Sequence, residues 1–165
     1  DTARHDFKLT LQNDFFEIFE DRLFALCKTQ LQPIAGIHQI LDALTIPYCV
    51  ASSGSREKMA ITLEVTKLAS YFTDKIFTAL EVPNGKPSPD IFLHVANHYG
   101  VAPDKCLVIE DSVNGVLAAK AANMTVIAYV ETGSFEAHEI AGADLCLSSM
   151  NTLHEQKALF APRKS

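Results

Sequence analysis

The sequence lacks an excess of basic residues and any long apolar run, and each absence excludes a class of protein. Lysine and arginine total 14 against 20 aspartates and glutamates, which gives a net charge of −6. Binding to nucleic-acid phosphates requires clustered basic side chains, so no nucleic-acid partner is expected. No apolar run approaches the roughly 18 residues of a membrane span. The polar start DTARHDFK does not resemble a signal peptide, so no membrane association is expected either.

Cysteine is also sparse, and the four cysteines, Cys27, Cys49, Cys106 and Cys146, are widely spaced. Three of them lie in apolar, strand-like stretches, which favours free buried thiols over disulfides. Free thiols are typical of a reducing compartment, so a cytoplasmic location is expected.

Apolar stretches typical of buried strands alternate along the chain with segments of helical character. The strand-like stretches are PYCVAS (47–52), KIFTAL (75–80), KCLVIE (105–110), TVIAYV (125–130) and ADLCLS (143–148). The helical segments are 7–29, 36–45, 55–69, Ser88 to Tyr99 with Ser88 as the N-cap and Gly100 as the stop, 112–123, 133–142 and 150–160. Continuous apolar strands separated by helices predict an α/β fold with a doubly wound parallel sheet.

Polar residues follow three of these strands, at the sheet edge where such folds bind ligands. Ser52 and Ser53 follow the first strand, Lys86 lies in the loop after the second, and Glu110 and Asp111 end the third. Because the carboxyl ends of parallel strands meet at one edge, we expect these residues to lie close together.

This set of residues has a consistent chemistry. Two adjacent carboxylates repel each other, and a divalent cation such as Mg²⁺, which prefers oxygen ligands, removes that repulsion. Lys86 offers a positive charge to a phosphate, while the Ser52 hydroxyl and the N–H groups of the SSGS turn can donate to phosphate oxygens. The pattern therefore predicts a site for a phosphoryl group and a metal ion.

Each motif also has a simpler interpretation when taken alone. Glu110 and Asp111 could favour the start of the next helix through its dipole. Ser52 and Ser53 could form an ordinary turn, and Lys86 could be solvated. His94 and His98 have the i, i+4 spacing of metal ligands but lack a third partner, so we expect them to lie on a partly exposed helix face.

Three motifs together resemble a known family. VASSGS (50–55), GKPSPDIF (85–92) and VIEDSVNGVLAAKAANM (108–124) resemble motifs two, three and four of the haloacid dehalogenase superfamily, in its β-phosphoglucomutase and sugar-phosphate phosphatase branch. The resemblance implies a Rossmann-like core over residues 32–165 and the C-terminal half of a helical cap over residues 1–31. It also implies a Mg²⁺-dependent phosphatase acting on a small phosphorylated metabolite.

The same resemblance implies roles for individual residues. Ser52 would bind the transferring phosphoryl group, and Lys86 would pair with the phosphate and the nucleophile, which makes these two the expected catalytic residues. The expected phosphate-binding residues are Ser52, Ser53 and Lys86, and the expected metal ligands are Glu110 and Asp111, with Ser112 supporting them from behind.

The chain departs from the family at the first motif, the Asp-x-Asp-Gly-Thr run that supplies the nucleophile, because no such run is present. We therefore expect a longer polypeptide whose first, central strand lies between the strands ending at Ser52 and Glu110, and a 165-residue chain that is inactive by itself. A hexose-phosphate mutase and a catalytically inactive phosphate-binding or regulatory domain remain open alternatives. The sequence indicates neither the substrate nor the oligomeric state.

Overall fold

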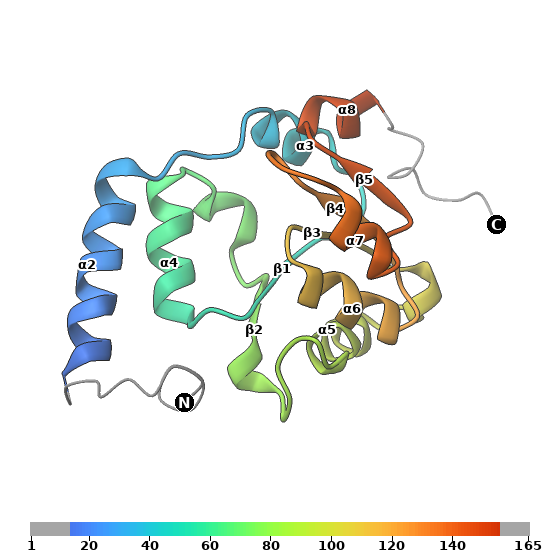
Figure 1. The fold of residues 1–165 in the computed structure, drawn as a ribbon, viewed down its shortest axis with the longest axis horizontal. Helices are drawn as coiled ribbons and strands as arrows, with labels where there is room; N and C mark the ends of the chain where they lie inside the picture. Colours follow the sequence, from blue (N-terminus) through green and yellow to red (C-terminus); the bar gives the residue numbers. More distant parts are fainter. Residues whose placement is uncertain (1–13, 156–165) are drawn as a thin grey trace.

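The computed structural model describes residues 14–155, in which helices alternate with parallel strands (Figure 1). The strands are β1 (Val50–Ser52), β2 (Ile76–Thr78), β3 (Leu107–Glu110), β4 (Thr125–Tyr129) and β5 (Leu145–Leu147). The helices are α2 (Phe15–Gln30), α3 (Ile37–Ala43), α4 (Arg56–Val65), α5 (Asp90–Tyr99), α6 (Val113–Ala121), α7 (Glu136–Ile140) and α8 (Met150–Glu155). Short 3₁₀ turns are η1 (Ala69–Phe72), η2 (Ala79–Glu81) and η3 (Pro103–Lys105). The predicted α/β class with parallel strands is confirmed.

The described strands form two separate sheets. β1 pairs with β2 from Val50 beside Ile76 to Ser52 beside Thr78. The second sheet has the order β3-β4-β5, with Glu110 beside Ala128. Among residues 14–155, β1 and β3 therefore do not pair with each other, and each has one edge without a neighbouring strand.

Both faces of the second sheet are covered by helices, as Figure 1 shows. Successive residues of a strand point to opposite faces. Accordingly, Val126 and Ala128 of β4 pack in a cluster with residues of α5 and α6. Ile127 packs on the other face with Ile40 of α3 and Leu147 of β5. Burial on both sides explains why the strand was a continuous apolar run in the sequence.

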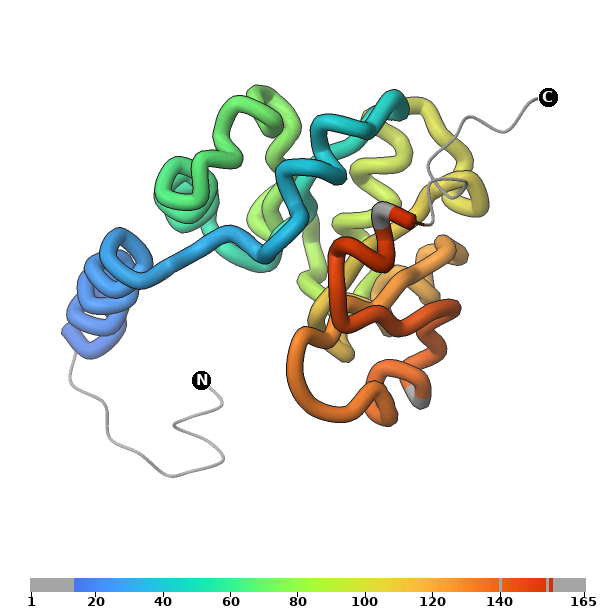
Figure 2. The backbone as a smooth tube through the Cα atoms, turned by 90° about the horizontal axis from the view of Figure 1, so that it is seen from above, coloured from blue at the N-terminus to red at the C-terminus, as the bar shows by residue number. Residues whose placement is uncertain are grey.

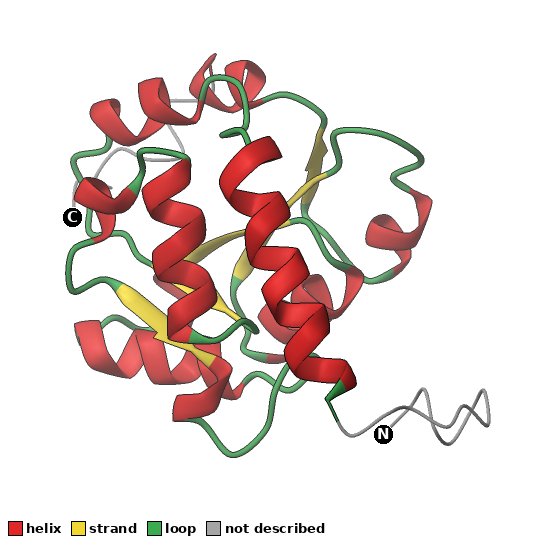
Figure 3. Cartoon of the chain, turned by 90° about the vertical axis from the view of Figure 1, so that its left-hand side faces the viewer, coloured by secondary structure: helices red, strands yellow, loops and turns green. Residues whose placement is uncertain are grey.

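Helix α2 lies at one end of the molecule (Figure 1) and packs beside α4, as the view from that end shows (Figure 3). Residues 31–36 carry the chain from α2 across to α3 (Figure 2). None of the residues of α2 is buried, and its exposed apolar side chains are Phe15, Phe16, Ile18, Phe19 and Leu26. Residues 7–13 of the helix expected there lie outside the described residues. Within residues 14–155, no helix has both the length and the apolarity needed to cross a membrane.

Several expected boundaries were wrong. The strand KIFTAL ends early at Thr78, because the Thr78 side chain and Glu81 form a capping box that starts η2. The helix expected over 55–69 ends at Val65, and Lys67 then adopts a positive φ of 60°. Pro89, not Ser88, is the N-cap of α5, because the Ser88 hydroxyl donates to the Asp90 carboxylate instead.

The expected end of α5 is confirmed, whereas the expected burial of the third strand is not. Gly100 ends α5 in the left-handed conformation with φ of 63°, as expected from its position. The third strand was expected to be buried, like the other apolar stretches, but Ile109 is 41% exposed. Ile109 lines an open pocket, which is described below.

Candidate active site at the strand ends

The end of β1 turns sharply before α4 begins. The Ser52 hydroxyl oxygen accepts a hydrogen bond of 3.0 Å from the backbone N–H of Gly54. Ser55 is the N-cap of α4, and its side chain accepts from the N–H of Lys58 at 3.2 Å. Ser53 lies between them and is exposed. The turn thus places backbone N–H groups and serine side chains at the edge of the sheet, as the sequence predicted for a turn of this composition.

Lys86 connects the two sheets at this edge. Its ammonium donates to the Ala51 carbonyl in β1 at 3.1 Å and to the Glu110 carboxylate at the end of β3. It also lies 4.9 Å from the centroid of the Phe92 ring. Only 8% of the Lys86 side chain is exposed, so the interpretation of this lysine as a solvated residue was wrong.

Asp90, at the first position of α5, holds the loop that carries Lys86. Its carboxylate accepts from the backbone N–H of Asn84 at 3.2 Å, from the Asn84 side-chain amide at 3.0 Å and from the Ser88 hydroxyl. The Ser88 bond, followed by the Asn84 bonds, lowers the pKa of Asp90 below its ordinary value. The ionised form of Asp90 therefore stabilises the loop on both sides of Lys86.

Glu110 is buried, with 9% of its side chain exposed, and both of its oxygens are engaged. One oxygen accepts from Lys86, and the other accepts from the Ser112 hydroxyl at 3.1 Å. Ser112 is the N-cap of α6 and accepts from the N–H of Gly115 at 3.0 Å. A Cβ at Gly115 would lie 2.0 Å from a Glu110 oxygen, so only glycine leaves room for this carboxylate.

Asp111 differs from its neighbour Glu110, because it is exposed and its carboxylate has no hydrogen-bond partner within residues 14–155. The Asp111 carbonyl, in contrast, accepts from Nε2 of His138 in α7 at 2.8 Å. A carbonyl only accepts, so this contact places the imidazole proton on Nε2.

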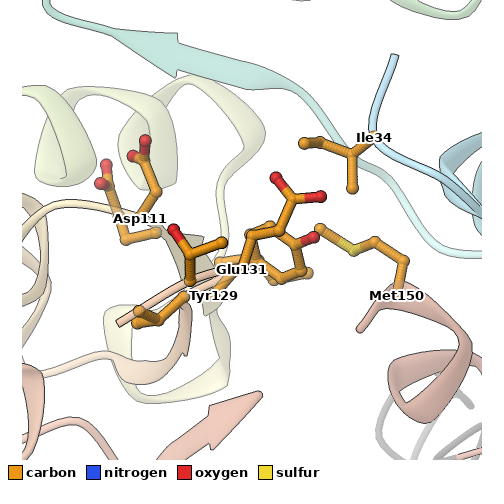
Figure 4. Close-up of a pocket in the computed structure, with 9 residues that line it drawn as sticks. Ile34, Asp111, Tyr129, Glu131 and Met150 are labelled. Atoms are coloured by element: carbon orange, nitrogen blue, oxygen red, sulfur yellow. The ribbon is translucent and has the colours of Figure 1, made fainter. Parts of the chain in front are cut away.

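An open pocket of about 450 Å³ lies beside this turn. Asp111 lies at one end of the pocket and Ile34 and Met150 at the other, with Tyr129 and Glu131 between them (Figure 4). The remaining residues that line the pocket are Ile109, Glu110, Val130 and Thr132. Ser52 and Lys86 do not line it, so the pocket and the lysine contact meet at Glu110.

The donors at this edge suit a hard cation. Asp111, Glu131 and Thr132, which line the pocket, offer oxygen atoms, and oxygen atoms are the ligands that Mg²⁺ prefers. Within the described part of the chain, no group of three His, Cys, Asp or Glu side chains is placed to bind a metal by itself. Mg²⁺ commonly binds through one or two carboxylates and completes its shell with water and substrate phosphate.

The structure brings together most of the residues that the sequence singled out. Lys86 donates to the carbonyl of Ala51, the residue before Ser52, and to the Glu110 carboxylate. The Ser112 hydroxyl donates to the other oxygen of Glu110. The roles assigned to these residues remain predictions. The i, i+4 histidines lie elsewhere, and both pack edge-on against Phe77.

Three residues of this region were missed or misread. Asp90 belonged to the GKPSPDIF stretch, but nothing in the sequence showed which groups its carboxylate binds. Nothing in the sequence showed that Gly115, which has no side chain, leaves the space that the Glu110 carboxylate fills. His138 gave no signal, because it follows Asp111 by 27 residues and meets it only through the tertiary fold.

Comparisons with known proteins found a matching family model and several relatives. The family model described as haloacid dehalogenase-like hydrolase matches residues 2–123. The chain is 30% identical over 109 residues to the 6-phosphogluconate phosphatase of Escherichia coli, a match that covers 66% of this chain and 49% of that protein. The chain spans about half, or less, of the length of the curated relatives it matches.

Solved structures resemble the chain over nearly its whole length. A haloacid dehalogenase-like protein of unknown function from Agrobacterium tumefaciens has a TM-score of 0.83 and 30% identity, covering 97% of this chain and 75% of that one. A HAD family hydrolase from Deinococcus radiodurans, solved with bound phosphate and sodium, has a TM-score of 0.79 and 27% identity, covering 98% and 75%.

Proposed function

The chain belongs to the haloacid dehalogenase-like hydrolases, and from that premise we propose that the protein is a Mg²⁺-dependent phosphatase of small phosphorylated metabolites. The position of Lys86 carries the proposal, because its ammonium contacts the end of β1 at Ala51 and the end of β3 at Glu110. A fixed positive charge between two strand ends complements the charged oxygens of a phosphoryl group. Similarity to a 6-phosphogluconate phosphatase supports a sugar-phosphate type of substrate.

The turn after β1 would bind the phosphoryl group. The Ser52 hydroxyl accepts from Gly54, so its own proton remains available to a phosphate oxygen. Ser53 would add its backbone N–H. Lys86 would neutralise charge on the same group and on the nucleophile that attacks it.

Asp111 and Glu110 would hold the metal ion, which when bound would supply positive charge to the phosphoryl oxygens. Asp111 suits direct contact because its carboxylate has no partner among the described residues. Glu110 accepts from Lys86 and Ser112, and its oxygens keep further lone pairs that could bind the metal. Glu110 would also hold the lysine in place. Ser112 would hold the Glu110 carboxylate in place through its hydroxyl.

The two unpaired strand edges support the proposal that the nucleophile lies on another strand, outside the described residues. β1 and β3 each lack one neighbour, and Ile109 of β3 is 41% exposed. Unpaired backbone groups in such a position are unfavourable, so a strand between them would complete the sheet. A carboxylate there would attack the phosphorus and break its bond to the substrate oxygen, which would take a proton from a general acid and leave as an alcohol; water would then hydrolyse the acyl phosphate, restoring the carboxylate and releasing inorganic phosphate.

The position of α2 supports the proposed boundary between a cap over residues 1–31 and the core. α2 packs beside α4 and buries none of its own residues. A helix placed this way at the end of the molecule can cover a substrate without being part of the sheet layers.

The test is turnover of p-nitrophenyl phosphate by the intact gene product, with and without Mg²⁺. We expect metal-dependent phosphate release that falls by a factor of about 100 or more in Asp111→Asn, since the metal contact would be lost. Lys105→Met serves as the control, because Lys105 is exposed and pairs with its sequence neighbour Asp104. The 165-residue chain by itself should release no phosphate.

Other outcomes would point to the alternatives. Phosphate binding without turnover in the intact protein would favour the inactive regulatory domain. Return of the phosphoryl group to a second position of a hexose phosphate, in place of its release, would favour the mutase. Phosphate release by the isolated chain would contradict the proposed additional strand.

A further inference from the structure

The turn formed by residues 110–112 is held from two sides. On one side, Ser112 caps α6 and binds the Glu110 carboxylate, and Gly115 leaves the space that this carboxylate fills. On the other side, the Asp111 carbonyl accepts from Nε2 of His138 at 2.8 Å. The first anchor acts on Glu110, whereas the second acts on Asp111 itself.

The direction of the Asp111 side chain depends on its backbone. Its carboxylate has no hydrogen-bond partner within the part of the chain that the structure describes, unlike that of Glu110. The backbone of Asp111 therefore determines where the carboxylate points at the end of the pocket (Figure 4). A hydrogen bond to the carbonyl of the same residue restricts the peptide group and, with it, the side chain.

The other ring nitrogen of His138 is buried at a cost in free energy. Nδ1 is buried and has no hydrogen-bond partner within residues 14–155, so the polar contact of this side chain is the one to Asp111. A buried polar atom without a partner is unfavourable, and an apolar residue of similar size would avoid that cost. Packing of α7 alone therefore does not account for a histidine here.

Helix α7 is a fixed support for this contact. It packs against α6 and β5. The chain after α7 returns to it through a hydrogen bond of 3.1 Å from the N–H of Ala143 to the His138 carbonyl. The ring thus extends from an anchored element to the turn.

We propose that His138 is a positioning residue that orients Asp111 for binding a divalent cation. This inference rests on the proposed function, because it takes Asp111 to be a metal ligand. His138 touches neither the metal nor the substrate in this scheme and acts only through the Asp111 carbonyl. Groups that orient metal ligands in this way typically change metal affinity by 10- to 100-fold.

The test measures Mg²⁺ binding by the intact gene product with isothermal titration calorimetry, without substrate. His138→Phe keeps the ring and removes the donor, and we expect Mg²⁺ affinity to fall by about tenfold. His138→Gln places an amide N–H at the same distance along the side chain and should bind Mg²⁺ as the natural protein does. Lys120→Met, which breaks the Lys120–Asp144 pair near α7 without touching the turn, is the control for loosened packing and should bind normally.

The outcomes separate this inference from the proposed function. Normal Mg²⁺ affinity in His138→Phe, with binding lost in Asp111→Asn, would overturn the role of His138 and leave the metal site standing. Unchanged binding in Asp111→Asn would overturn both. If His138→Phe does not fold, His138→Asn replaces it, because its shorter amide cannot reach the carbonyl. Weak binding by the glutamine variant as well as the asparagine variant would then contradict the proposal, and recovery by glutamine alone would support it.

Discussion

Lys86 and Glu110 form an ion pair between the loop after β2 and the end of β3, with only 8% and 9% of their side chains exposed. Taking two charges out of water is costly, and the pair persists because each group has further partners. Lys86 also donates to Ala51, and Glu110 also accepts from Ser112. The pair therefore fixes the relative position of the two sheets as well as the charge of the site.

Removal of one partner of this pair should be more harmful than removal of both. Lys86→Met leaves the Glu110 carboxylate buried and unpaired, and we expect it to lower the free energy of unfolding by about 3 to 5 kcal/mol. The double variant Lys86→Met with Glu110→Gln should recover part of that loss, because the remaining amide carries no charge. Urea unfolding measures both, with Lys105→Met as the exposed-lysine control, expected to change stability by less than about 0.5 kcal/mol. Additive losses in the double variant would contradict the coupling.

Gly115→Ala should change the stability of the protein through two effects of opposite sign. Alanine is favoured over glycine by about 1 kcal/mol in a helix interior, so propensity alone predicts that the substitution stabilises the first turn of α6 by at most that amount. The new Cβ would lie 2.0 Å from a Glu110 oxygen, however, and the carboxylate would have to leave Lys86 or Ser112. We expect the clash to prevail and stability to fall by about 1 to 3 kcal/mol in urea unfolding.

Gly85→Ala is the matched control for that substitution, because a Cβ at Gly85 would have no atom within 4 Å. Its stability should stay close to that of the natural protein. A stabilised Gly115→Ala protein would mean that Glu110 does not occupy the space beside Gly115.

The sequence predicted the fold at the level of strands and helices, because both depend on local patterns. The apolar run at β4 is buried on both faces through Val126 and Ile127, as continuous hydrophobicity implied. Boundaries were less predictable, because side-chain contacts set them. Thr78 and Glu81 end a strand that propensity would continue, and the Ser88 hydroxyl binds a carboxylate when its position suggested a cap.

The candidate site was predictable in membership but not in its internal contacts. Residues after parallel strands share one edge, so the proximity of Lys86 and Glu110 follows from fold class. Which groups pair does not follow from it: the sequence offered no reason for Glu110 to bind Lys86 while the Asp111 carboxylate has no hydrogen-bond partner within residues 14–155. Likewise, His138 reaches Asp111 only because α7 packs against α6.

Asp90 should make the loop around Lys86 sensitive to acid. Bonds from Ser88 and then Asn84 lower the pKa of Asp90 below its ordinary value of 3.8, so the ionised form is favoured in the folded state. Its contribution is then fully present above pH 3.8 and is lost as the pH falls through the lower, folded pKa. We expect Asp90→Asn to be less stable than the natural protein at neutral pH, with a difference in Tm that shrinks in acid.

Thermal unfolding followed by circular dichroism at pH 7 and at about pH 3 measures that difference. Asp104→Asn provides the control, since Asp104 is exposed and forms an ion pair with the neighbouring Lys105 at 3.4 Å. If the difference in Tm between the natural protein and Asp90→Asn widens as the pH falls, the ionised Asp90 carboxylate is not what stabilises the loop.

Cys49, just before β1, should react slowly with alkylating reagents. Burial, and then the neighbouring Cys106 thiol, raise the pKa of Cys49 to about 11. The thiolate is the reactive form, and at pH 8 a thiol with that pKa is only about one part in a thousand ionised. Mass spectrometry after iodoacetamide treatment should show little labelling of Cys49 at pH 8 and a steady rise at higher pH, with rapid labelling at pH 8 once urea has unfolded the chain. Equal rates for folded and unfolded protein at pH 8 would show that the thiol is neither shielded nor kept protonated, because the raised pKa exists only in the folded environment of β1.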